Sequence, residues 1–409
     1  MSRSVLTLAA LGALWLSVCA EPAAPAPRGT IVIGADLPLS GTDGAEGQPV
    51  LAGIRFAIQQ QGRLRGYDVA LAAYDDTVQG THDPGAGVID LERLTANPLV
   101  LGMIGPFNAN VAVAEIPIAA RKSMVLISPA TTNECLTKNL AYCEGLASRL
   151  HGDLPVSFFR VSATDDLQGP AMAGYAFTAL ELKRMAVISD STIYGRSLAD
   201  SFQDRYVTLG GSIAMRFDYD PTTQFEFSGV LQRARRAGAD GVYFGGITAN
   251  GGCKLRAQMA DYMPAGAVEL GGEGFALDAQ CIQDAGLNAA GMYGTLVSVN
   301  TADVAAAAGI VEQFRRAHPD PADYSVFTFP AYDAARILLA GIARAIDARG
   351  GTLPSREEVR AQVAATRGFP STVGAVSFDA AGDTSLRYVS IYATRGVPLA
   401  WNYVTQVLI

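Results

Sequence analysis

The sequence has few of the residues on which catalysis and metal binding depend. Its 409 residues include three histidines, His82, His151 and His318, and none has a partner at the spacing of metal ligands. Glycine-rich phosphate loops, a Gly-x-Ser-x-Gly elbow and a His-Glu-x-x-His motif are all absent. We therefore expect no catalytic residue, no metal site and no cofactor, and an enzyme has no positive support.

Charge is also scarce. Only 17% of the residues are charged, the net charge is −8, and no basic stripe alternates with aromatic residues. A nucleic-acid partner is therefore not expected. The hydrophobic share of 49% is typical of a folded protein rather than a disordered one. A chain of this length favours two lobes, each with its own core.

The N-terminus has the pattern of an export signal. Arg3 precedes an uncharged apolar run, Val5–Val18, which is too short to span a bilayer comfortably and ends in small residues. Two processing routes stay open. Leu16–Cys19 resembles a bacterial lipobox, which would lipidate Cys19, whereas ordinary cleavage would follow Ala20. Residues 1–19 are thus expected to be a signal peptide and residues 20–29 a Pro/Ala tether, which predicts a periplasmic or extracytoplasmic protein, as an anchored lipoprotein in the first case.

Five cysteines fit the lipidation route, because Cys19 would be the odd one. The other four allow three connectivities, of which we favour the nearest-neighbour pairing, Cys135 with Cys143 and Cys253 with Cys281. Free buried thiols are the alternative. Export to an oxidising compartment favours the disulfides. A zinc site is disfavoured because no Cys-x-x-Cys spacing occurs.

From residue 30 onward, short apolar strands alternate with amphipathic helices. In the first half, strands are expected at 30–36, 68–74, 99–104 and 124–127, with helices after Pro49 and over 86–97 and 111–121. The pattern then restarts, with strands at 184–189, 212–217, 241–244 and 267–271 and helices over 169–182, 198–209 and 227–236. A long helix is expected over 331–348, and two terminal strands, 374–378 and 388–394, around a turn at 379–383. Such alternation predicts two α/β lobes with parallel sheets and a cleft at the carboxyl ends of their strands.

Two polar segments follow neighbouring strands of the first lobe. One is Gly105–Asn110, which leads into a helix, and the other is Ser128–Asn133. Backbone N–H groups at helix starts, together with short hydroxyl and amide side chains, suit a carboxylate. The alternative is that these residues only cap helices and form turns.

Several short segments along the chain, taken in their order, resemble motifs of a known family. Leu39-Ser40-Gly41, Tyr74-Asp75-Asp76, the Ser128–Thr132 segment, Gln168-Gly169-Pro170 and Tyr243–Gly246 are similar to motifs of the type I periplasmic binding proteins that bind leucine, isoleucine and valine. The resemblance runs from about residue 31 to the C-terminus. It implies two Rossmann-like lobes joined by three crossover strands, near 161–164, 297–300 and 374–377. The first lobe would comprise residues 30–162 and 298–375, and the second 163–297 and 376–409.

The resemblance also implies a ligand site. On the first lobe, Thr132 would bind the carboxylate of an amino acid, and Ala130 would accept from its ammonium group. Thr131 and the loop of Asn108, Ala109 and Asn110 would complete that side. On the second lobe, Glu273 would pair with the ammonium and Tyr194 would form a wall.

Three positions depart from the family pattern. Ile247 replaces an aromatic residue after Gly-Gly, Glu46 stands where an aromatic residue is common, and Ala109 between two asparagines replaces a serine. The side chain that the site accepts is therefore left open.

The implied function is that of a substrate-binding protein which delivers an amino acid or analogue to an ABC permease. Membrane contact would occur only through the lipid anchor. Related binders of amides, urea-like compounds or aromatic acids are alternatives, as is a sensor that feeds a receptor or regulator.

Overall fold

The structure is a computed structural model in which residues 26–222, 226–297 and 307–409 are described. The expected signal peptide, Cys19 and the first part of the tether lie outside these residues. Within the described ranges, no helix combines the length and hydropathy needed to cross a bilayer.

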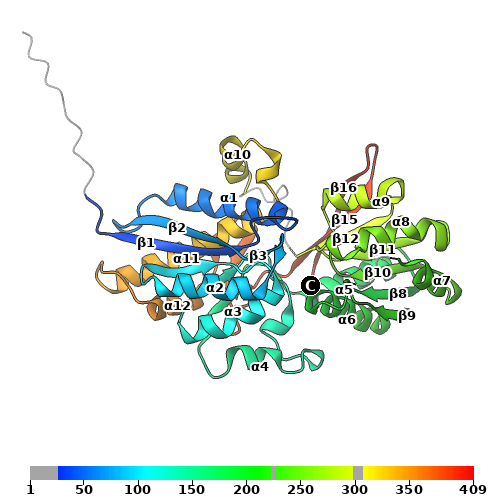
Figure 1. The fold of residues 1–409 in the computed structure, drawn as a ribbon, viewed down its shortest axis with the longest axis horizontal. Helices are drawn as coiled ribbons and strands as arrows, with labels where there is room; N and C mark the ends of the chain where they lie inside the picture. The colour runs from blue at the N-terminus through cyan, green and yellow to red at the C-terminus, as the bar shows by residue number, and fades with distance from the viewer. Residues whose placement is uncertain (1–25, 223–225, 298–306) are drawn as a thin grey trace, which may run out of the picture.

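Two α/β lobes lie side by side along the long axis of the molecule (Figure 1). The first lobe contains five parallel strands in the order β2–β1–β5–β6–β7. These strands are β1 (Thr30–Leu37), β2 (Asp68–Asp75), β5 (Val100–Ile104), β6 (Leu126–Ser128) and β7 (Phe158–Arg160).

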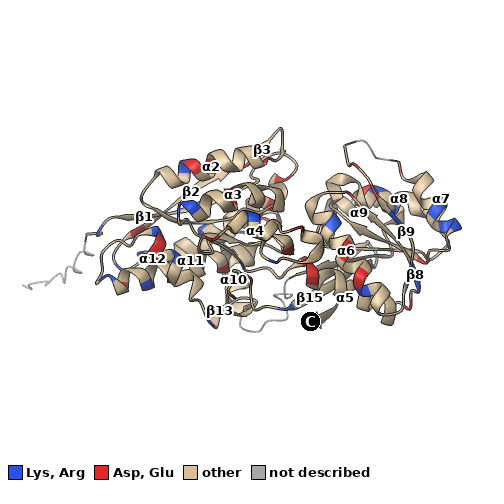
Figure 2. Cartoon of the chain, turned by 90° about the horizontal axis from the view of Figure 1, so that it is seen from below, with Lys and Arg blue, Asp and Glu red and all other residues tan. Residues whose placement is uncertain are grey.

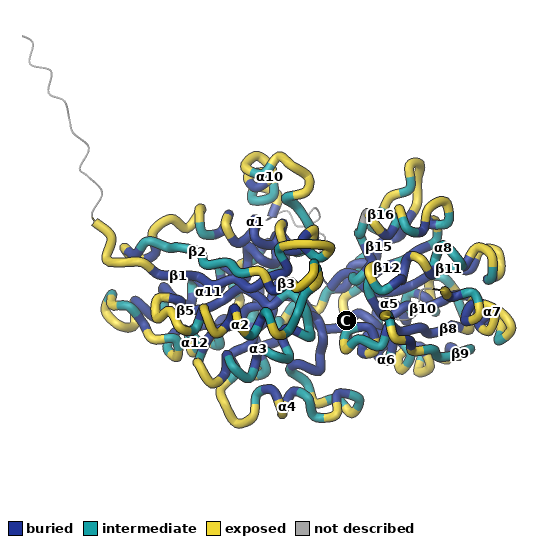
Figure 3. The backbone as a smooth tube through the Cα atoms, in the orientation of Figure 1, coloured by how far each residue is buried: buried dark blue, intermediate teal, exposed yellow. Residues whose placement is uncertain are grey.

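Helices cover both faces of this sheet because side chains alternate along each strand. Ile31 and Ile33 of β1 belong to the core under α1 and α11, whereas Val32 belongs to the core under α2 and α3. The helices on the first face are α1 (Gly44–Gln61), α10 (Ala308–Ala317), α11 (Thr328–Ala348) and α12 (Arg356–Ala364). Those on the second face are α2 (Pro84–Ala96), α3 (Ala109–Arg121) and the short α4 (Leu146–His151). The inner strands are buried, the edge strand β2 is half-buried, and the outer helix surfaces are exposed (Figure 3).

The second lobe contains seven strands in the order β16–β15–β12–β11–β10–β8–β9. The parallel strands are β8 (Arg184–Ser189), β9 (Ser212–Asp218), β10 (Gly241–Gly245), β11 (Val268–Gly271) and β12 (Met292–Leu296). An antiparallel hairpin, β15 (Tyr388–Arg395) and β16 (Ala400–Leu408), extends this sheet beside β12. Its helices are α5 (Asp165–Thr178) and α6 (Ile193–Thr208) against one core, and α7 (Ser228–Arg236), α8 (Gly252–Tyr262) and α9 (Ala279–Ala285) on the other side.

Both sheets reverse their strand order at one point. In the first lobe, β1 lies between β2 and β5, and in the second lobe β8 lies between β9 and β10. In open parallel sheets the loops at such a reversal diverge to opposite faces and leave a crevice for a ligand. The loops concerned follow β1 and β5 in one lobe and β8 and β10 in the other.

The expectations for the segments between the lobes and for the C-terminus need correction. Residues 161–164 are irregular backbone rather than a strand, and residues 298–300 lie outside the described ones. β14 (Gly374–Val376) pairs with β13 (Phe369–Ser371) in a small separate sheet. The strand expected at 388–394 is confirmed as β15, which pairs with β12 and with the unpredicted β16 rather than with residues 374–378. The numerical lobe boundaries stay a prediction.

The four described cysteines lie in the two expected pairs. Sγ atoms are 1.91 Å apart in Cys135–Cys143 and 1.87 Å apart in Cys253–Cys281. The first pair ties a loop between two short 3₁₀ turns, Glu134–Leu136 and Ala141–Cys143. The second ties α8 to α9.

Candidate functional site

Hydrogen bonds join the two polar loops of the first lobe. The hydroxyl of Ser128 donates to the carbonyl of Pro106 over 2.7 Å. The hydroxyl of Thr131 lies 3.0 Å from that carbonyl and 2.9 Å from the carbonyl of Phe107. Thr131 is buried, and its own carbonyl accepts from Arg160. Its polar groups therefore hold the loops together rather than face a ligand in this structure.

The loop after β5 forms the first turn of α3. Asn108 occupies the N-cap position without a side-chain capping bond, and its Oδ1 is screened from solvent with no hydrogen-bond partner. Ala109 begins the helix, and the side chain of Asn110 accepts from the N–H of Val111. This helix start offers the free donors and positive partial charge expected for a carboxylate site.

In the second lobe, Glu273 is held by a glutamine on α5. The N–H of Glu273 donates to Oε1 of Gln168 over 3.1 Å, and the hydroxyl of Thr295 donates to the same oxygen over 2.7 Å. Gln168 is fully buried, so its side-chain position is fixed by packing as well as by these bonds. The glutamine thus orients the turn after β11 that presents Glu273.

Tyr194 and Ile247 lie against this turn from the two switch-point loops. Thr192 caps α6 by accepting from the N–H of Gly195, which places Tyr194 in the first helical turn. The hydroxyl of Tyr194 accepts from the N–H of Gly274 over 3.0 Å. A Cβ at Gly274 would lie 2.8 Å from Cγ2 of Ile247, so a glycine permits this close approach.

The two lobes meet where Thr132 lies near Glu273. A hydrogen bond from the buried Thr132 side chain lowers the pKa of the Glu273 carboxyl and of the fully buried Asp165 carboxyl. Burial acts in the opposite direction and prevails, raising the pKa of Glu273 to about 8. Burial, followed by the charges of Glu134 and Glu273, also raises the pKa of Asp165. Glu273 is therefore largely protonated near neutral pH while no cation is present.

Glu46 lies on the first turn of α1 and faces the same region. Burial and, to a smaller extent, the charges of Asp278 and Asp43 together raise its pKa to about 7. Asp278 caps α9 of the second lobe, so its influence places Glu46 near the gap between the lobes. The charge of Glu46 in turn raises the pKa of Glu273.

A hollow lies between the lobes on the side of the crossover segments. Of the predicted site residues, Glu273 is the one that lines it, together with Pro129, Val161, Ser162 and Phe327. The wall is mostly apolar. Thr132, Glu273, Tyr194, Ile247 and Glu46 are thus linked by contacts or by charge, whereas no described contact joins Asn108 or Asn110 to them.

Sequence reasoning missed the residue that holds the loop of Thr131 and Thr132. Arg160 is fully buried and pairs with Asp383, its Nε lying 2.7 Å from Oδ1. Its Nη1 donates to the carbonyls of Thr131 and Asn133 over 3.2 and 2.7 Å. Charge-assisted bonds of this kind fix the loop geometry. The end of an apolar strand, Phe158–Arg160, gave the one available signal, an arginine on an otherwise buried segment.

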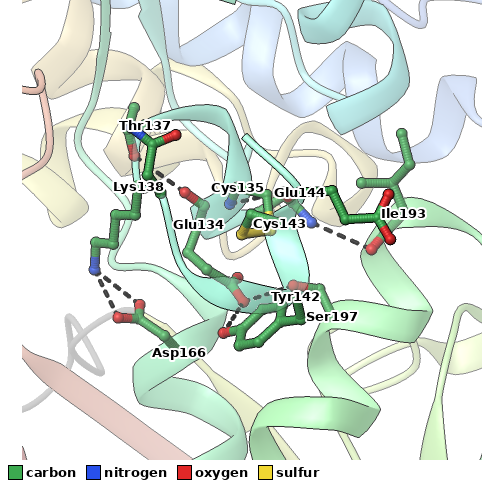
Figure 4. The surroundings of a disulfide bond; sticks show 12 residues. Glu134, Cys135, Thr137, Lys138, Tyr142, Cys143, Glu144, Asp166, Ile193 and Ser197 are labelled. Carbon is green, nitrogen blue, oxygen red and sulfur yellow. Dashed lines mark hydrogen bonds and ion pairs between the residues drawn. A yellow bond between two sulfur atoms is a disulfide. The ribbon is translucent and has the colours of Figure 1, made fainter. Parts of the chain in front are cut away.

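The disulfide loop that follows Thr132 makes further contacts with the second lobe (Figure 4). Oε1 of Glu134 accepts from the hydroxyls of Ser197 on α6 and Tyr142, over 2.6 and 2.7 Å. Lys138 pairs with Asp166 on α5 over 2.7 Å. The loop that carries Thr132 is therefore bound directly to α5 and α6 of the second lobe.

The described ranges contain no group of three or more His, Cys, Asp or Glu side chains arranged to hold a metal ion. The loop residue His82 is half-buried, and its Nδ1 lies 2.6 Å from the carboxylate of Asp43.

Comparison with known proteins gives a consistent result. Residues 30–393 match the family model of the periplasmic binding proteins. The chain is similar to Leu/Ile/Val-binding protein homolog 1 of Brucella abortus, with 26% identity over 380 residues that cover 92% of this chain and 94% of the relative. It is also similar to homolog 3 of Brucella melitensis, with 29% identity over 367 residues, or 88% and 90% of the two chains.

Solved structures share the fold at lower identity. A leucine-binding protein of Thermotoga maritima has a TM-score of 0.75 and 23% identity, over 92% of this chain and 99% of that one. A solute-binding protein of R. palustris in complex with 4-hydroxybenzoate has a TM-score of 0.76 and 17% identity, over 93% and 97%.

Proposed function

The chain belongs to the periplasmic binding protein family, and from this membership we propose that it captures a small amino acid or analogue outside the cytoplasm for an ABC transporter. One observation carries the proposal: Thr132 of the first lobe and Glu273 of the second lie together beside the loops at the two switch points. A ligand between these loops touches both lobes, which is the condition for ligand-driven closure.

The chemistry of the site fits an α-amino acid. The ammonium group would replace the proton of Glu273 and contact the carbonyl of Ala130. The carboxylate would take the Thr132 hydroxyl and the free N–H groups at the start of α3. Tyr194 and Ile247 would form the wall beside the ligand. An aromatic acid, such as the ligand of one structural neighbour, has no ammonium and would leave Glu273 unpaired.

Closure would bend the chain at the segments between the lobes, including residues 161–164 and the region of β14. The closed form would then dock on a permease. The relatives are named for binding leucine, isoleucine and valine. A sensor that feeds a receptor is the alternative to the transport role. Release of bound ligand to permease-containing vesicles distinguishes these roles, because a sensor would not support uptake.

Calorimetric titration of the purified protein with amino acids, amides and aromatic acids tests the proposal. Thr132→Ala and Glu273→Ala should each weaken binding by about 10-fold or more, since each removes a hydrogen bond to a charged group. Glu357→Ala, on the exposed first turn of α12, is the matched control and should bind like the unaltered protein. Unchanged affinity in both site variants would refute the site.

A further inference from the structure

The cleft contains more carboxyl groups than the ammonium of one amino-acid head group can pair with. Glu46 lies on the first lobe, and Glu273 and Asp278 lie on the second. Among the described residues, neither Glu46 nor Glu273 forms an ion pair with a Lys, Arg or His side chain. The nearby Lys138 and Arg160 are already paired with Asp166 and Asp383.

The position of Glu46 is the key observation. Its Oε2 is screened from solvent, and no described group forms a hydrogen bond with it. Asp278 is the first of the charged groups that act on it, and Glu46 itself acts on Glu273. Its carboxyl therefore interacts with two carboxyls of the opposite lobe, Asp278 and Glu273, and no described basic side chain pairs with it. A buried carboxylate in this position is costly unless a cation pairs with it.

The basic residues of the molecule do not supply that cation. Figure 2 shows that the basic residues of α7 and α12 lie far from the junction of the lobes. Asp43, which also acts on Glu46, is itself paired with His82 and adds a further negative charge. The surroundings of Glu46 are thus acidic on its own lobe and on the opposite one.

From these contacts we propose that the ligand carries a second positive charge at the end remote from its amino-acid head group, and that Glu46 with Asp278 receives it. The inference rests on the proposed amino-acid site. In that site Glu273 takes the α-ammonium, so one zwitterionic head group leaves Glu46 and Asp278 without a cationic partner, although Asp278 accepts from the N–H of Gln280. A dibasic amino acid, such as lysine, ornithine or arginine, provides the missing charge.

The apolar wall agrees with this class of ligand. Ile247 and Tyr194 both lie against Gly274, next to Glu273. The methylene stem of a basic side chain packs on apolar groups while its charged end reaches a polar partner. Ile247 would thus contact the stem, and the carboxyls of Glu46 and Asp278 its charged end.

Lysine and norleucine are the matched probes, because they differ by the terminal amine. Calorimetry on the purified protein at pH 7.5 should give an affinity about 10-fold or more higher for lysine, ornithine or arginine than for norleucine. Glu46→Gln should abolish this preference while norleucine binds as well as before or better. Asp278→Asn should reduce the preference independently, which covers the case in which Glu46→Gln does not fold. Glu92→Gln, on the exposed face of α2, should leave both affinities unchanged.

The outcomes separate the two proposals. If norleucine or leucine binds and every dibasic amino acid binds more weakly, the second-charge inference is wrong and the proposed function stands. An unchanged lysine preference in Glu46→Gln and in Asp278→Asn also refutes the inference. If no amino acid of either kind binds, the proposed function fails and the inference fails with it.

Discussion

Binding of an amino acid should release a proton from Glu273. Burial holds the pKa of this carboxyl at about 8 in the empty cleft. At pH 7 about 0.9 of the molecules would then carry a proton on Glu273, which the ammonium of the ligand must displace. For a neutral amino acid, the association constant should rise by about 9-fold between pH 6 and 7, by about 5-fold between pH 7 and 8, and level off above pH 8.

Affinity should rise with pH because the ligand binds the ionised form of Glu273. An ammonium pairs with the carboxylate, so the bound state has a low Glu273 pKa and the free state a high one. Affinity is therefore gained as pH rises through the free-state value, until the ammonium of the ligand itself deprotonates. Norleucine isolates this effect, because it gives Glu46 no cation to replace its own proton.

Calorimetry at pH 7 in two buffers with different ionisation enthalpies measures the released proton directly. The two buffers should give heats that differ by about 0.9 of the difference between their ionisation enthalpies. Glu273→Gln should remove this difference, whereas Glu357→Gln should retain it. Equal heats in the two buffers, together with an affinity that does not change between pH 6 and 8, would refute the role assigned to Glu273.

Three further predictions concern stability. Arg160→Met should lower the free energy of unfolding by about 3–5 kcal/mol in denaturant titrations, because it leaves Asp383 buried without its partner; the double variant Arg160→Met/Asp383→Asn should regain part of the loss, and equal stability of the two variants would contradict this reasoning. Asp76→Asn should raise the melting temperature at pH 8 but not at pH 4, since burial raises the pKa of Asp76 from 3.8 to about 8 and stability is lost as pH rises between these values; a melting temperature that rises equally at both pH values would exclude this cause. Replacing Cys253 and Cys281 by alanine should lower the free energy of unfolding by about 3.6 kcal/mol, because this disulfide joins residues 28 positions apart. Replacing Cys135 and Cys143, which are 8 positions apart, should lower it by about 2.5 kcal/mol. Of the two, only the replacement of Cys135 and Cys143 should weaken ligand binding, since their loop follows Thr132.

The alternation of strands and helices was sufficient to predict the two α/β lobes. Apolar runs such as β5 and β10 are buried on both sides, so their composition identifies them without knowledge of their neighbours. β16 was missed because it lies at the edge of the sheet. Its residues are half-buried on both faces and give no clear alternation. The hairpin of β15 could therefore not be predicted either, since its second strand was absent from the expected set of strands.

The site could be predicted where residues follow a strand directly, and not where a role depends on a distant partner. Thr132 follows β6 of the first lobe, and Glu273 follows β11 of the second. Residues in these positions lie at the carboxyl ends of parallel strands, where ligands bind in open α/β sheets. Arg160 pairs with a residue 223 positions away, and Gln168 supports a turn 105 positions away. Neither separation leaves a periodic signal in the sequence. Burial of a polar side chain, which marks both roles, appears only in the folded chain.

The same burial accounts for both properties proposed for the cleft. Glu273 and Glu46 lack a described basic partner, so each favours its protonated form while the cleft is empty. A ligand cation that displaces the proton of such a carboxyl forms the ion pair that no described basic side chain of the protein provides. Affinity should therefore depend on pH through each carboxyl that the ligand engages. A lysine-like ligand should release more protons than norleucine at pH 7, because it engages Glu46 as well as Glu273. The number of protons released thus reports whether the ligand engages Glu46 in addition to Glu273, independently of any difference in affinity.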